Sequence, residues 1–363
     1  MRKTPFFEYI KQYDPFIANF CGWQMPIYIS SIKDEHFAVR NNVGLFDISH
    51  MALFKIVGHK VLDFVSNLIT NDVFNLLKMR ALYSPICNND GYILDDVIVF
   101  KQDDSLLYIV ANAANADKVQ SWLIKNNEYS LEITRPPKAA LSVQGPKSAD
   151  VLTDFFHNNI VKSLEYYSFA KVNIGDQHLL LSRTGYTGEL GYEIWMPSSI
   201  AGDFWQFLIN KNVTICGLGA RDILRLESGY PLYGHELNEN ITPLEAGLSW
   251  TVKFEKEQFI GKDALLEQKS KGIEKTLVGI EILNRGLIPR QDSEIYIGDQ
   301  KIGFITSGSY SFYLNKTICL GYVNINDYVL GREVEIIVRN RKIKGAITKK
   351  NFYYNPEMKK SLI

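Results

Sequence analysis

The stretch Gly91–Phe100 reads GYILDDVIVF, and nearly all of its residues are β-branched, aromatic or aliphatic, the composition of a strand. Neighbouring side chains of a strand point to opposite faces, so Asp95 and Asp96 are expected on different faces. Asp95 is expected on the same face as Ile93, Val97 and Val99. Asp96 is expected on the same face as Leu94, Ile98 and Phe100. A strand that is apolar on both faces indicates a sheet covered on both sides, where a carboxylate needs a compensating partner. The alternative is an edge strand whose Asp residues oppose aggregation or cap a turn.

The segment after this strand predicts a hairpin. The polar stretch 101–105 would form its loop and 106–112 (LLYIVAN) its second strand. In that register Val110 lies opposite Asp96 and Asn112 opposite Leu94, so Asp96 and Asn112 share a side. A one-residue slip would reverse the face. A carboxylate beside an amide is suited to bind an N–H group of a ligand.

The rest of the chain predicts an α+β region followed by an all-β region. Helices are expected at 33–42, at 60–69, from Asn115 through Trp122, after Gly145-Pro146, at 201–210 and at 220–228. Strands are expected near 170–183 and 192–196. Pro136 and Pro137 break regular structure and suggest a boundary. From 274 onward short strands alternate with turn residues, a pattern typical of a small barrel or sandwich.

The composition excludes several classes of protein. The 363 residues are 46% hydrophobic and 22% charged, as in soluble globular proteins, and the length suggests roughly two or three domains. Forty basic and forty acidic residues cancel, which argues against non-specific nucleic-acid binding as the main function. The four cysteines form no C-x-x-C pair and the six histidines are scattered, so no metal site is expected. We expect a cytoplasmic chain with no membrane segment, since no long apolar run or signal core is visible.

Two further stretches favour ligand binding. Residues 182–194 read SRTGYTGELGYEI, where three glycines could bring the backbone close to a ligand, or simply form a turn with solvated Glu189 and Glu193. Residues 217–237 read GLGARDILRLESGYPLYGHEL and include a helix with Arg221 in its first turn. A cation there opposes the helix dipole, which suggests a carboxylate partner. Asp222 and Arg225 on the same helix are interpreted as a solvated face.

These stretches together resemble the aminomethyltransferase, or T-protein, family of the glycine cleavage system, and the resemblance spans nearly the whole chain in order. The matching blocks are TPFFEYI, FCGWQMPIYISSIKDEHFAVRNNVGLFDISHM, ITNDV, CNNDGYILDDVIV, VANAAN, VQGPK, SRTGYTGELGYEI, GLGARDILRLESGYPLYGHEL, TPLEAGLSW, FIGKDAL and GFITSGSYS. The resemblance implies an α+β fold of three domains arranged as a cloverleaf around a central folate channel. The implied limits are 1–50 with 138–245 for a discontinuous first domain, 51–137 for a ferredoxin-like second domain, 246–273 for a connector and 274–363 for a C-terminal β-barrel.

The resemblance also implies the chemistry. A lipoyl arm on H-protein would carry an S-aminomethyl group, and tetrahydrofolate, as co-substrate without a metal, would accept the one-carbon unit. H-protein would be a transient partner, and the P- and L-proteins of the same system functional ones. The key carboxylate of the family corresponds to Asp96, the pterin-binding Glu to Glu193 and the Arg of GARD to Arg221. The other residues in matching pocket blocks are Met51, Tyr83, Asn112 and Tyr186.

Some positions depart from the family pattern. The usual SHMG is Ser49-His50-Met51-Ala52, GEDG is Gly188-Glu189-Leu190-Gly191, and SPTLG is Ser311-Phe312-Tyr313-Leu314-Asn315. The last departure puts the contact of loop 309–316 with ligand or H-protein in question, and the C-terminal tail with Lys359-Lys360 aligns poorly. A basic patch of Arg285, Arg290, Lys316 and Lys349-Lys350 is a candidate docking surface for an acidic H-protein, although such residues are ordinary on a barrel surface.

Three rival functions are open to the sequence. The first is the folate-dependent demethylation module of dimethylglycine or sarcosine oxidising enzymes, but no G-x-G-x-x-G fingerprint for their flavin domain occurs. The second is a non-catalytic folate-binding relative that maintains iron–sulfur enzymes and has a Lys-Gly-Cys motif. Here the corresponding place reads Glu227-Ser228-Gly229-Tyr230, without Cys. The third is a small-ligand binding protein with no chemistry, which an Asp96 on a solvated sheet face would favour.

Overall fold

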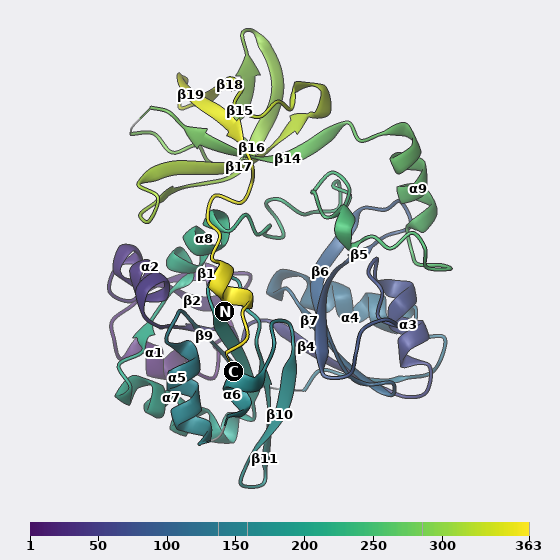
Figure 1. Ribbon diagram of the computed structural model, residues 1–363, viewed down its shortest axis with the longest axis vertical. Coiled ribbons are helices and arrows are strands. Elements are labelled where there is room, and N and C mark those ends of the chain that lie inside the picture. The colour runs from purple at the N-terminus through teal and green to yellow at the C-terminus, as the bar shows by residue number, and fades with distance from the viewer. Residues whose placement is uncertain (137, 158, 285, 363) are drawn as a thin grey trace.

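The computed structural model describes residues 1–363 except 137, 158, 285 and 363, and shows three lobes (Figure 1). A closed barrel lies at one end, and two lobes that each contain a sheet and helices lie side by side at the other. The predicted α+β class with a C-terminal barrel is confirmed. The strands of each sheet fall within the expected domain ranges, whereas the limits themselves stay predictions. Pro137 and Arg285 lie outside the described residues.

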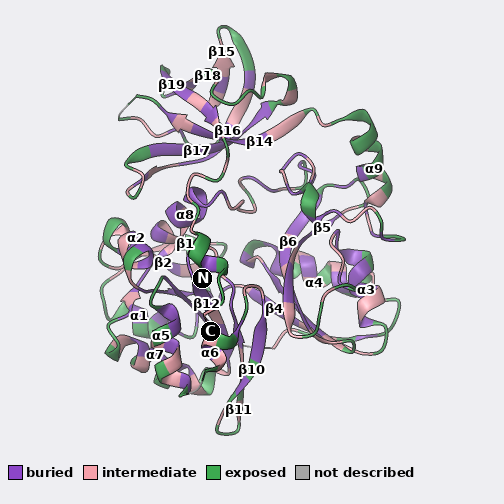
Figure 2. Ribbon diagram, viewed as in Figure 1, coloured by how far each residue is buried: buried purple, intermediate pink, exposed green. Residues whose placement is uncertain are grey.

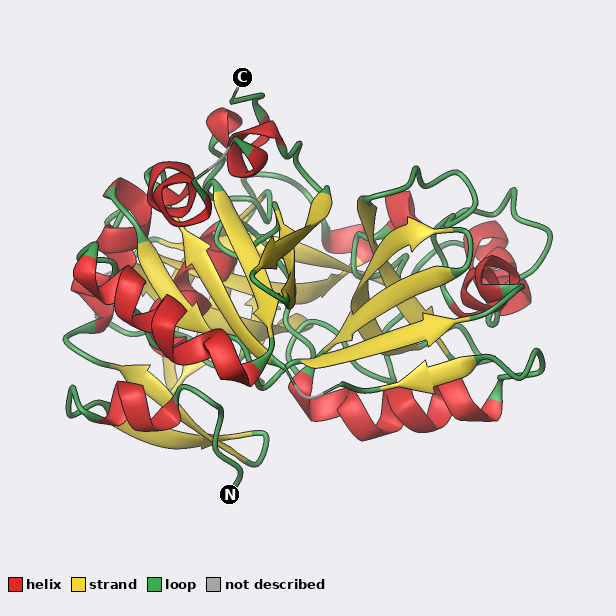
Figure 3. Ribbon diagram, turned by 90° about the horizontal axis from the view of Figure 1, so that it is seen from below, coloured by secondary structure: helices red, strands yellow, loops and turns green. Residues whose placement is uncertain are grey.

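The first lobe contains a six-stranded sheet in the order β10-β11-β12-β9-β3-β13 and a separate hairpin, β1 with β2. Its strands are β1 (Phe16–Phe20), β2 (Trp23–Tyr28), β3 (Gly44–Asp47), β9 (Ala139–Gln144), β10 (Phe169–Ile174), β11 (Gln177–Ser182), β12 (Gly191–Met196) and β13 (Thr214–Ile215). Its helices are α1 (Phe7–Lys11), α2 (Ile32–Asn41), α5 (Ser148–Phe156), α6 (Ile160–Ser163), α7 (Ala201–Asn210) and α8 (Leu218–Glu227). Figure 3 shows the helices outside the strands of this lobe.

The second lobe contains a five-stranded antiparallel sheet in the order β5-β6-β7-β4-β8. Its elements are β4 (Ala52–Val57), α3 (Val61–Leu68), β5 (Arg80–Cys87), β6 (Ile93–Asp103), β7 (Leu106–Ala111), α4 (Ala116–Lys125) and β8 (Glu132–Thr134). Without β5, the order along the chain is β4-α3-β6-β7-α4-β8, the β-α-β-β-α-β pattern of the predicted ferredoxin-like fold. Strand β5 extends that sheet at its edge.

The third lobe is a barrel that closes because β14 pairs with both β17 and β19. Its strands are β14 (Lys275–Ile282), β15 (Glu294–Ile297), β16 (Gln300–Ser311), β17 (Lys316–Asn324), β18 (Glu333–Val338) and β19 (Arg341–Thr348). Each strand contributes buried side chains, mostly aliphatic, to one cluster in the barrel. Figure 2 marks buried segments in the barrel strands. The connector before it contains α9 (Lys262–Lys271), and a short helical turn, Pro356–Lys359, follows it.

Strand β6 is covered on both faces, as its composition predicts. Val97 and Val99 pack with α3 and α4 in one apolar cluster. Phe100 packs on the opposite side, in a cluster that joins this sheet to the strands and helix α8 of the first lobe. This double cover places the acidic pair between two lobes rather than on a solvated face, so the condition that favours a binding protein without chemistry is not met.

The detailed register of β6 differs from the prediction in two ways. Ile98, not Asp96, pairs with Val110, because β6 continues to Asp103 and the loop is shorter than expected. A bulge also makes Leu94 an extra residue, since Asp95 pairs with Ile86 while Ile93 pairs with Cys87. Leu94 therefore packs in the cluster of Val97, and Ile93 in the cluster of the connector, so the predicted faces of these two residues were wrong.

Candidate active site

The acidic pair is held by two asparagines that follow β7. Asp95 is fully buried. Its Oδ1 accepts hydrogen bonds from Asn112 Nδ2 at 2.9 Å and from Asn115 Nδ2 at 2.6 Å, and its Oδ2 accepts the backbone N–H of Asn112 at 3.1 Å. Three donors therefore compensate this carboxylate. The predicted helix cap at Asn115 is wrong in one respect, because its side chain bonds Asp95 and makes no cap hydrogen bond.

Asp96 is half-buried and its carboxylate lies beside the same amide. Asn112 Nδ2 also donates to Asp96 Oδ1 at 2.8 Å, and the hydroxyl of Tyr83 donates to Asp96 Oδ2 at 3.0 Å. Burial raises the pKa of Asp96, and the negative charge of Asp95 raises it further. Burial likewise raises the pKa of Asp95. Asp96 therefore holds a proton more readily than an ordinary Asp.

The predicted pairing of Asp96 with Asn112 is confirmed, but their arrangement has a different consequence. The Asn112 amide already donates to both carboxylates, so it orients Asp96 rather than offering its N–H groups to a ligand. Tyr83 stands on the neighbouring strand β5, and its ring stacks on the indole of Trp250 with centroids 6.0 Å apart. Trp250 is 59% exposed, and no pattern around it predicted its contact with Tyr83, the donor to Asp96.

The glycine-rich stretch folds back so that Thr184 bonds Glu193 on β12. Thr184 Oγ1 donates to Glu193 Oε2 at 2.7 Å, and no hydrogen bond from a described residue reaches Glu193 Oε1. Burial raises the pKa of Glu193, while Thr184 and the charge of Arg221 act in the opposite sense. The carboxylate thus has one oxygen that can accept from a ligand.

Arg221 lies near Glu193, as its unusual place in the first turn of α8 suggests. Its guanidinium lies over the ring of Tyr186 at 4.9 Å, and its buried Nη1 has no hydrogen-bond partner among the described residues. Burial lowers the pKa of Arg221, and the charge of Glu193 raises it. The neighbouring His50 is buried, and burial together with Arg221 lowers its pKa to about 3, so its imidazole is neutral at physiological pH.

The charge of Asp96 acts on three tyrosine side chains, and one of them, Tyr186, lies under Arg221. Burial raises the pKa of Tyr83, Tyr167 and Tyr186, and the charge of Asp96 adds to the rise at each of them. The charge of Glu193 acts on Tyr167 as well. The two groups of predicted residues therefore share one electrostatic environment.

The remaining predicted pocket residues take supporting positions. Tyr186 bonds the carbonyl oxygen of Pro231 at 2.5 Å and stacks on Tyr230 with centroids 5.8 Å apart. Met51 packs against the apolar cluster between the two lobes, which Tyr167 also contacts. Tyr167 was missed because an aromatic residue outside a motif reads as ordinary core, and Tyr230 because nothing in its motif distinguishes it from the neighbouring turn residues.

The interpretation of Arg225 as part of a solvated face is wrong. Arg225 is 1% exposed and makes ion pairs with Asp222 and Glu236, each at 2.8 Å. Glu189 is buried as well, not solvated. Both residues serve the packing of α8 and the glycine-rich loop, and a buried charge of this kind needs its partners in place.

Three residues of the expected basic patch make contacts within the chain. Arg290 Nη1 donates to the carbonyl of Gly308 at 3.0 Å, and Lys316 pairs with Glu281 at 2.9 Å. Lys350 is half-buried, its Nζ donates to the carbonyls of Ala246 and Gly247, and burial lowers its pKa to about 8. Arg285 lies outside the described residues and Lys316 remains exposed, so the patch stays a prediction.

The divergent loop 309–316 packs inward. The hydroxyl of Ser311 donates to the buried carboxylate of Glu227, and the ring of Phe312 lies edge-on to His36 at 6.0 Å. Tyr313 lies edge-on to Tyr353 of the C-terminal tail at 5.2 Å. This loop joins the barrel to α2, α8 and the tail.

Comparison with known proteins assigns the chain to a family. Residues 6–256 match the GCVT N-terminal domain and residues 275–353 the glycine cleavage T-protein C-terminal barrel domain. The chain belongs to the aminomethyltransferases of the glycine cleavage system. Aminomethyltransferases of Thermoanaerobacter sp. (strain X514) and Caldanaerobacter subterraneus subsp. tengcongensis are each 42% identical to it, over 97% of this chain and 98% and 96% of theirs.

A solved aminomethyltransferase has the same fold. The crystal structure of glycine cleavage system aminomethyltransferase T from Bartonella henselae superposes with a TM-score of 0.92 at 31% identity, over 97% of this chain and 98% of that one. As a member of the aminomethyltransferase family, the chain is a transferase. Among the described residues, no group of three or more His, Cys, Asp or Glu side chains is arranged to hold a metal ion. No helix in the described ranges is long and apolar enough to cross a membrane.

Proposed function

We propose that this protein transfers the one-carbon unit of the S-aminomethyl-lipoyl group on H-protein to tetrahydrofolate. The products would be 5,10-methylenetetrahydrofolate, ammonia and dihydrolipoyl H-protein. The observation that carries the proposal is that the acidic pair on β6 and a carboxylate–guanidinium pair with unused hydrogen-bonding atoms lie close to the same tyrosines, Tyr167 and Tyr186. Binding and chemistry can then act on one ligand.

Glu193 and Arg221 fit the recognition of a pterin. The edge of a tetrahydropterin offers several N–H donors and a carbonyl acceptor. Glu193 Oε1 can accept from an N–H group of that edge, while the unpartnered Nη1 of Arg221 can donate to a carbonyl or carboxylate. A buried donor without a partner is unfavourable. A ligand that accepts from Arg221 Nη1 would therefore remove a free-energy cost that the ligand-free protein bears.

Asp96 fits the role of the catalytic carboxylate. In the transfer, the bonds from the carbon to ammonia nitrogen and to sulfur break, and two bonds to folate nitrogens form. The two protons lost by those nitrogens leave on ammonia and on the lipoyl thiol, so no oxidant is required. Positive charge develops on the carbon as ammonia departs, and a fixed Asp96 carboxylate stabilises it. Tyr83 and Asn112 hold that carboxylate in place before the reaction.

The role of H-protein follows from the same reaction. Its lipoyl arm must enter, react and leave, so the contact would be transient and small, below ~1,200 Å² of buried surface. The P- and L-proteins would act before and after this step without contributing residues to the site.

The test is a turnover assay with purified components. Aminomethylated H-protein and tetrahydrofolate should give methylenetetrahydrofolate and ammonia in equal amounts, whereas unmodified lipoyl H-protein should give neither. Ammonia release at the same rate with and without tetrahydrofolate, or no methylenetetrahydrofolate at all, would contradict the proposal. Binding of tetrahydrofolate without any turnover would instead support the non-catalytic alternative.

A further inference from the structure

The C-terminal tail, residues 351–362, leaves the barrel and runs back onto the first lobe (Figure 1). The backbone N–H groups of Phe352 and Tyr353 both donate to the carbonyl of Glu227 at the end of α8, at 2.9 and 2.8 Å. The helical turn Pro356–Lys359 then places Met358 in a buried position. The tail is thus packed against the lobe that contains Glu193 and Arg221.

One end of the glycine-rich loop bonds the tail through Arg183. This side chain is 1% exposed, and its Nη2 donates to the carbonyl oxygens of Met358 at 3.0 Å and Lys360 at 2.6 Å. Its Nη1 donates to the carbonyl of Leu164 at 2.9 Å. A buried guanidinium that bonds only backbone carbonyls depends on each of them, because it has no carboxylate to offset its burial.

The other end of the loop bonds the tail through Glu189, which is 3% exposed. Glu189 Oε1 accepts from Arg40 at 2.8 Å and from the hydroxyl of Tyr353 at 2.5 Å, and Oε2 accepts from Asn355 Nδ2 at 2.6 Å. The guanidinium of Arg40 also lies 3.9 Å from the ring centroid of Tyr353. Two of the three donors to this carboxylate therefore come from the tail.

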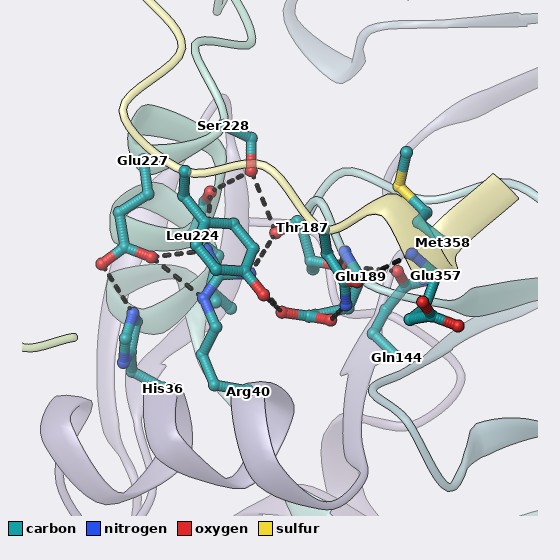
Figure 4. Close-up of polar contacts among 12 residues, drawn as sticks. His36, Arg40, Gln144, Thr187, Glu189, Leu224, Glu227, Ser228, Glu357 and Met358 are labelled. Carbon is teal, nitrogen blue, oxygen red and sulfur yellow. Dashed lines mark hydrogen bonds and ion pairs between the residues drawn. The ribbon is translucent and has the colours of Figure 1, made fainter. Parts of the chain in front are cut away.

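Arg40 alone does not satisfy Glu189, because it also serves Glu227. Its Nε donates to Glu227 Oε2 at 3.1 Å and its Nη2 forms a close ion pair with the same oxygen. Figure 4 shows Arg40 between Glu227 and Glu189, with His36 next to the other oxygen of Glu227, Oε1. One guanidinium shared between two buried carboxylates leaves each dependent on neutral donors, and for Glu189 these are Tyr353 and Asn355.

Between Arg183 and Glu189, the loop carries two residues that contact the proposed pterin-binding pair. Thr184 is the donor to Glu193, and Tyr186 lies under the guanidinium of Arg221. A third link runs through Tyr230, whose hydroxyl lies 3.9 Å from the sulfur of Met358 and whose ring stacks on Tyr186. The tail thus fixes the loop on both sides of Thr184 and Tyr186 without approaching Asp96 through any described contact.

We propose that the C-terminal tail is a positioning element for folate recognition, which holds the loop Arg183–Glu189 so that Thr184 and Tyr186 keep Glu193 and Arg221 in place. This inference rests on the proposed function. The tail would set the affinity for tetrahydrofolate. It would not change the geometry of the acidic pair or the rate of one-carbon transfer.

The test compares a double variant of the full chain, Tyr353→Phe with Asn355→Ala, with Tyr354→Ala. Tyr354 lies between the two altered residues, is 65% exposed, and is the matched control. The double variant removes two donors to Glu189 and keeps the ring over Arg40. We expect the Kd and KM for tetrahydrofolate to rise ~10-fold or more, as for the loss of hydrogen bonds to a charged group that positions a ligand, with kcat within ~2-fold.

Each outcome separates this inference from the proposed function. Tetrahydrofolate affinity of the folded double variant within ~2-fold of the unchanged protein, or an equal loss in Tyr354→Ala, would overturn the positioning role alone. No binding of tetrahydrofolate by the unchanged protein would overturn both. If the double variant does not fold, Asn355→Ala takes its place. This variant keeps Tyr353 and Arg40 as donors to Glu189, so its Kd for tetrahydrofolate should rise ~3-fold. An unchanged Kd, or an equal rise in Tyr354→Ala, would overturn the positioning role.

Discussion

Replacement of Glu193 by Gln should weaken tetrahydrofolate binding without harming the fold. The substitution keeps the size of the side chain, and an amide oxygen can still accept from Thr184. What disappears is the charge and the acceptor at Oε1, which becomes an N–H donor facing the N–H edge of the ligand. One charge-assisted hydrogen bond to a buried group contributes about 1.5–3 kcal/mol, which corresponds to a roughly 10- to 150-fold rise in Kd.

Stability should respond differently from binding in this variant. Burial raises the pKa of Glu193, which means that the folded protein bears a desolvation penalty for its charge. Removing that charge relieves the penalty, although Arg221 loses a partner, so the Tm should change little. A loss of affinity with an unchanged Tm would locate the effect in the ligand contact.

The assay is a calorimetric titration of tetrahydrofolate into the unchanged protein, Glu193→Gln and the control Glu165→Gln. Glu165 carries the same charge but its side chain is 74% exposed and pairs with Arg80 at the surface. The control should bind tetrahydrofolate as the unchanged protein does. Equal affinity of Glu193→Gln and the unchanged protein, or equal losses in both variants, would refute the assignment of Glu193 to the pterin edge.

The remaining predictions concern the acidic pair and the buried ion pairs. Asp96→Asn should lower turnover at least ~10²-fold, the scale of one preorganised electrostatic group, and Asp95→Asn far less, so equal losses would contradict the assignment. Since burial and Asp95 raise the pKa of Asp96, kcat/KM should rise with pH through a midpoint above the usual Asp range, and Asp95→Asn should move that midpoint to lower pH; an unmoved midpoint would exclude Asp96 as the titrating group. Burial tends to raise the pKa of Glu227, but His36, Arg40 and Ser311 outweigh it and hold that pKa below its usual value. The contribution of Glu227 to stability is therefore present above about pH 4.3 and is lost as the pH falls through its folded-state pKa. In Arg40→Ala, the free energy of unfolding should accordingly fall less steeply at acid pH. At neutral pH, Arg40→Ala should lower the free energy of unfolding, measured by denaturant titration, by about 3–5 kcal/mol. Arg80 lies nearer the surface, so Arg80→Ala should lower it by less than about 1 kcal/mol. Similar losses in both variants would contradict the importance of burial.

Local composition was enough to predict the elements that support the site. The β-branched run around Asp95 and Asp96 forms a strand covered on both faces, and the hairpin, the helices and the barrel strands occur where periodicity indicated them. The pairing of Asp96 with Asn112 was predictable because a two-residue error in register preserves the face. The bulge at Leu94 was not, because one extra residue leaves no mark in a sequence of alternating apolar side chains.

The partners of buried charges were the part that sequence could not supply. Arg225 and Glu189 look like solvated residues because their compensating groups come from distant segments, Glu236 and Ser307 for the former, Arg40 and the tail for the latter. The tail residues Tyr353 and Asn355 carry no motif, and only the fold shows that they bond the glycine-rich loop. Long-range contacts of this kind depend on topology rather than on local pattern.

A crystal structure of this protein with bound tetrahydrofolate would show whether Glu193, Arg221 and Asp96 act on the same ligand. We expect a hydrogen bond of about 2.7–3.1 Å between a pterin N–H group and Glu193 Oε1, a ligand acceptor on Arg221 Nη1, and the Asp96 carboxylate facing the nitrogens that receive the carbon. A folate bound away from Glu193 and Arg221, or with its reactive nitrogens turned from Asp96 towards solvent, would contradict this expectation.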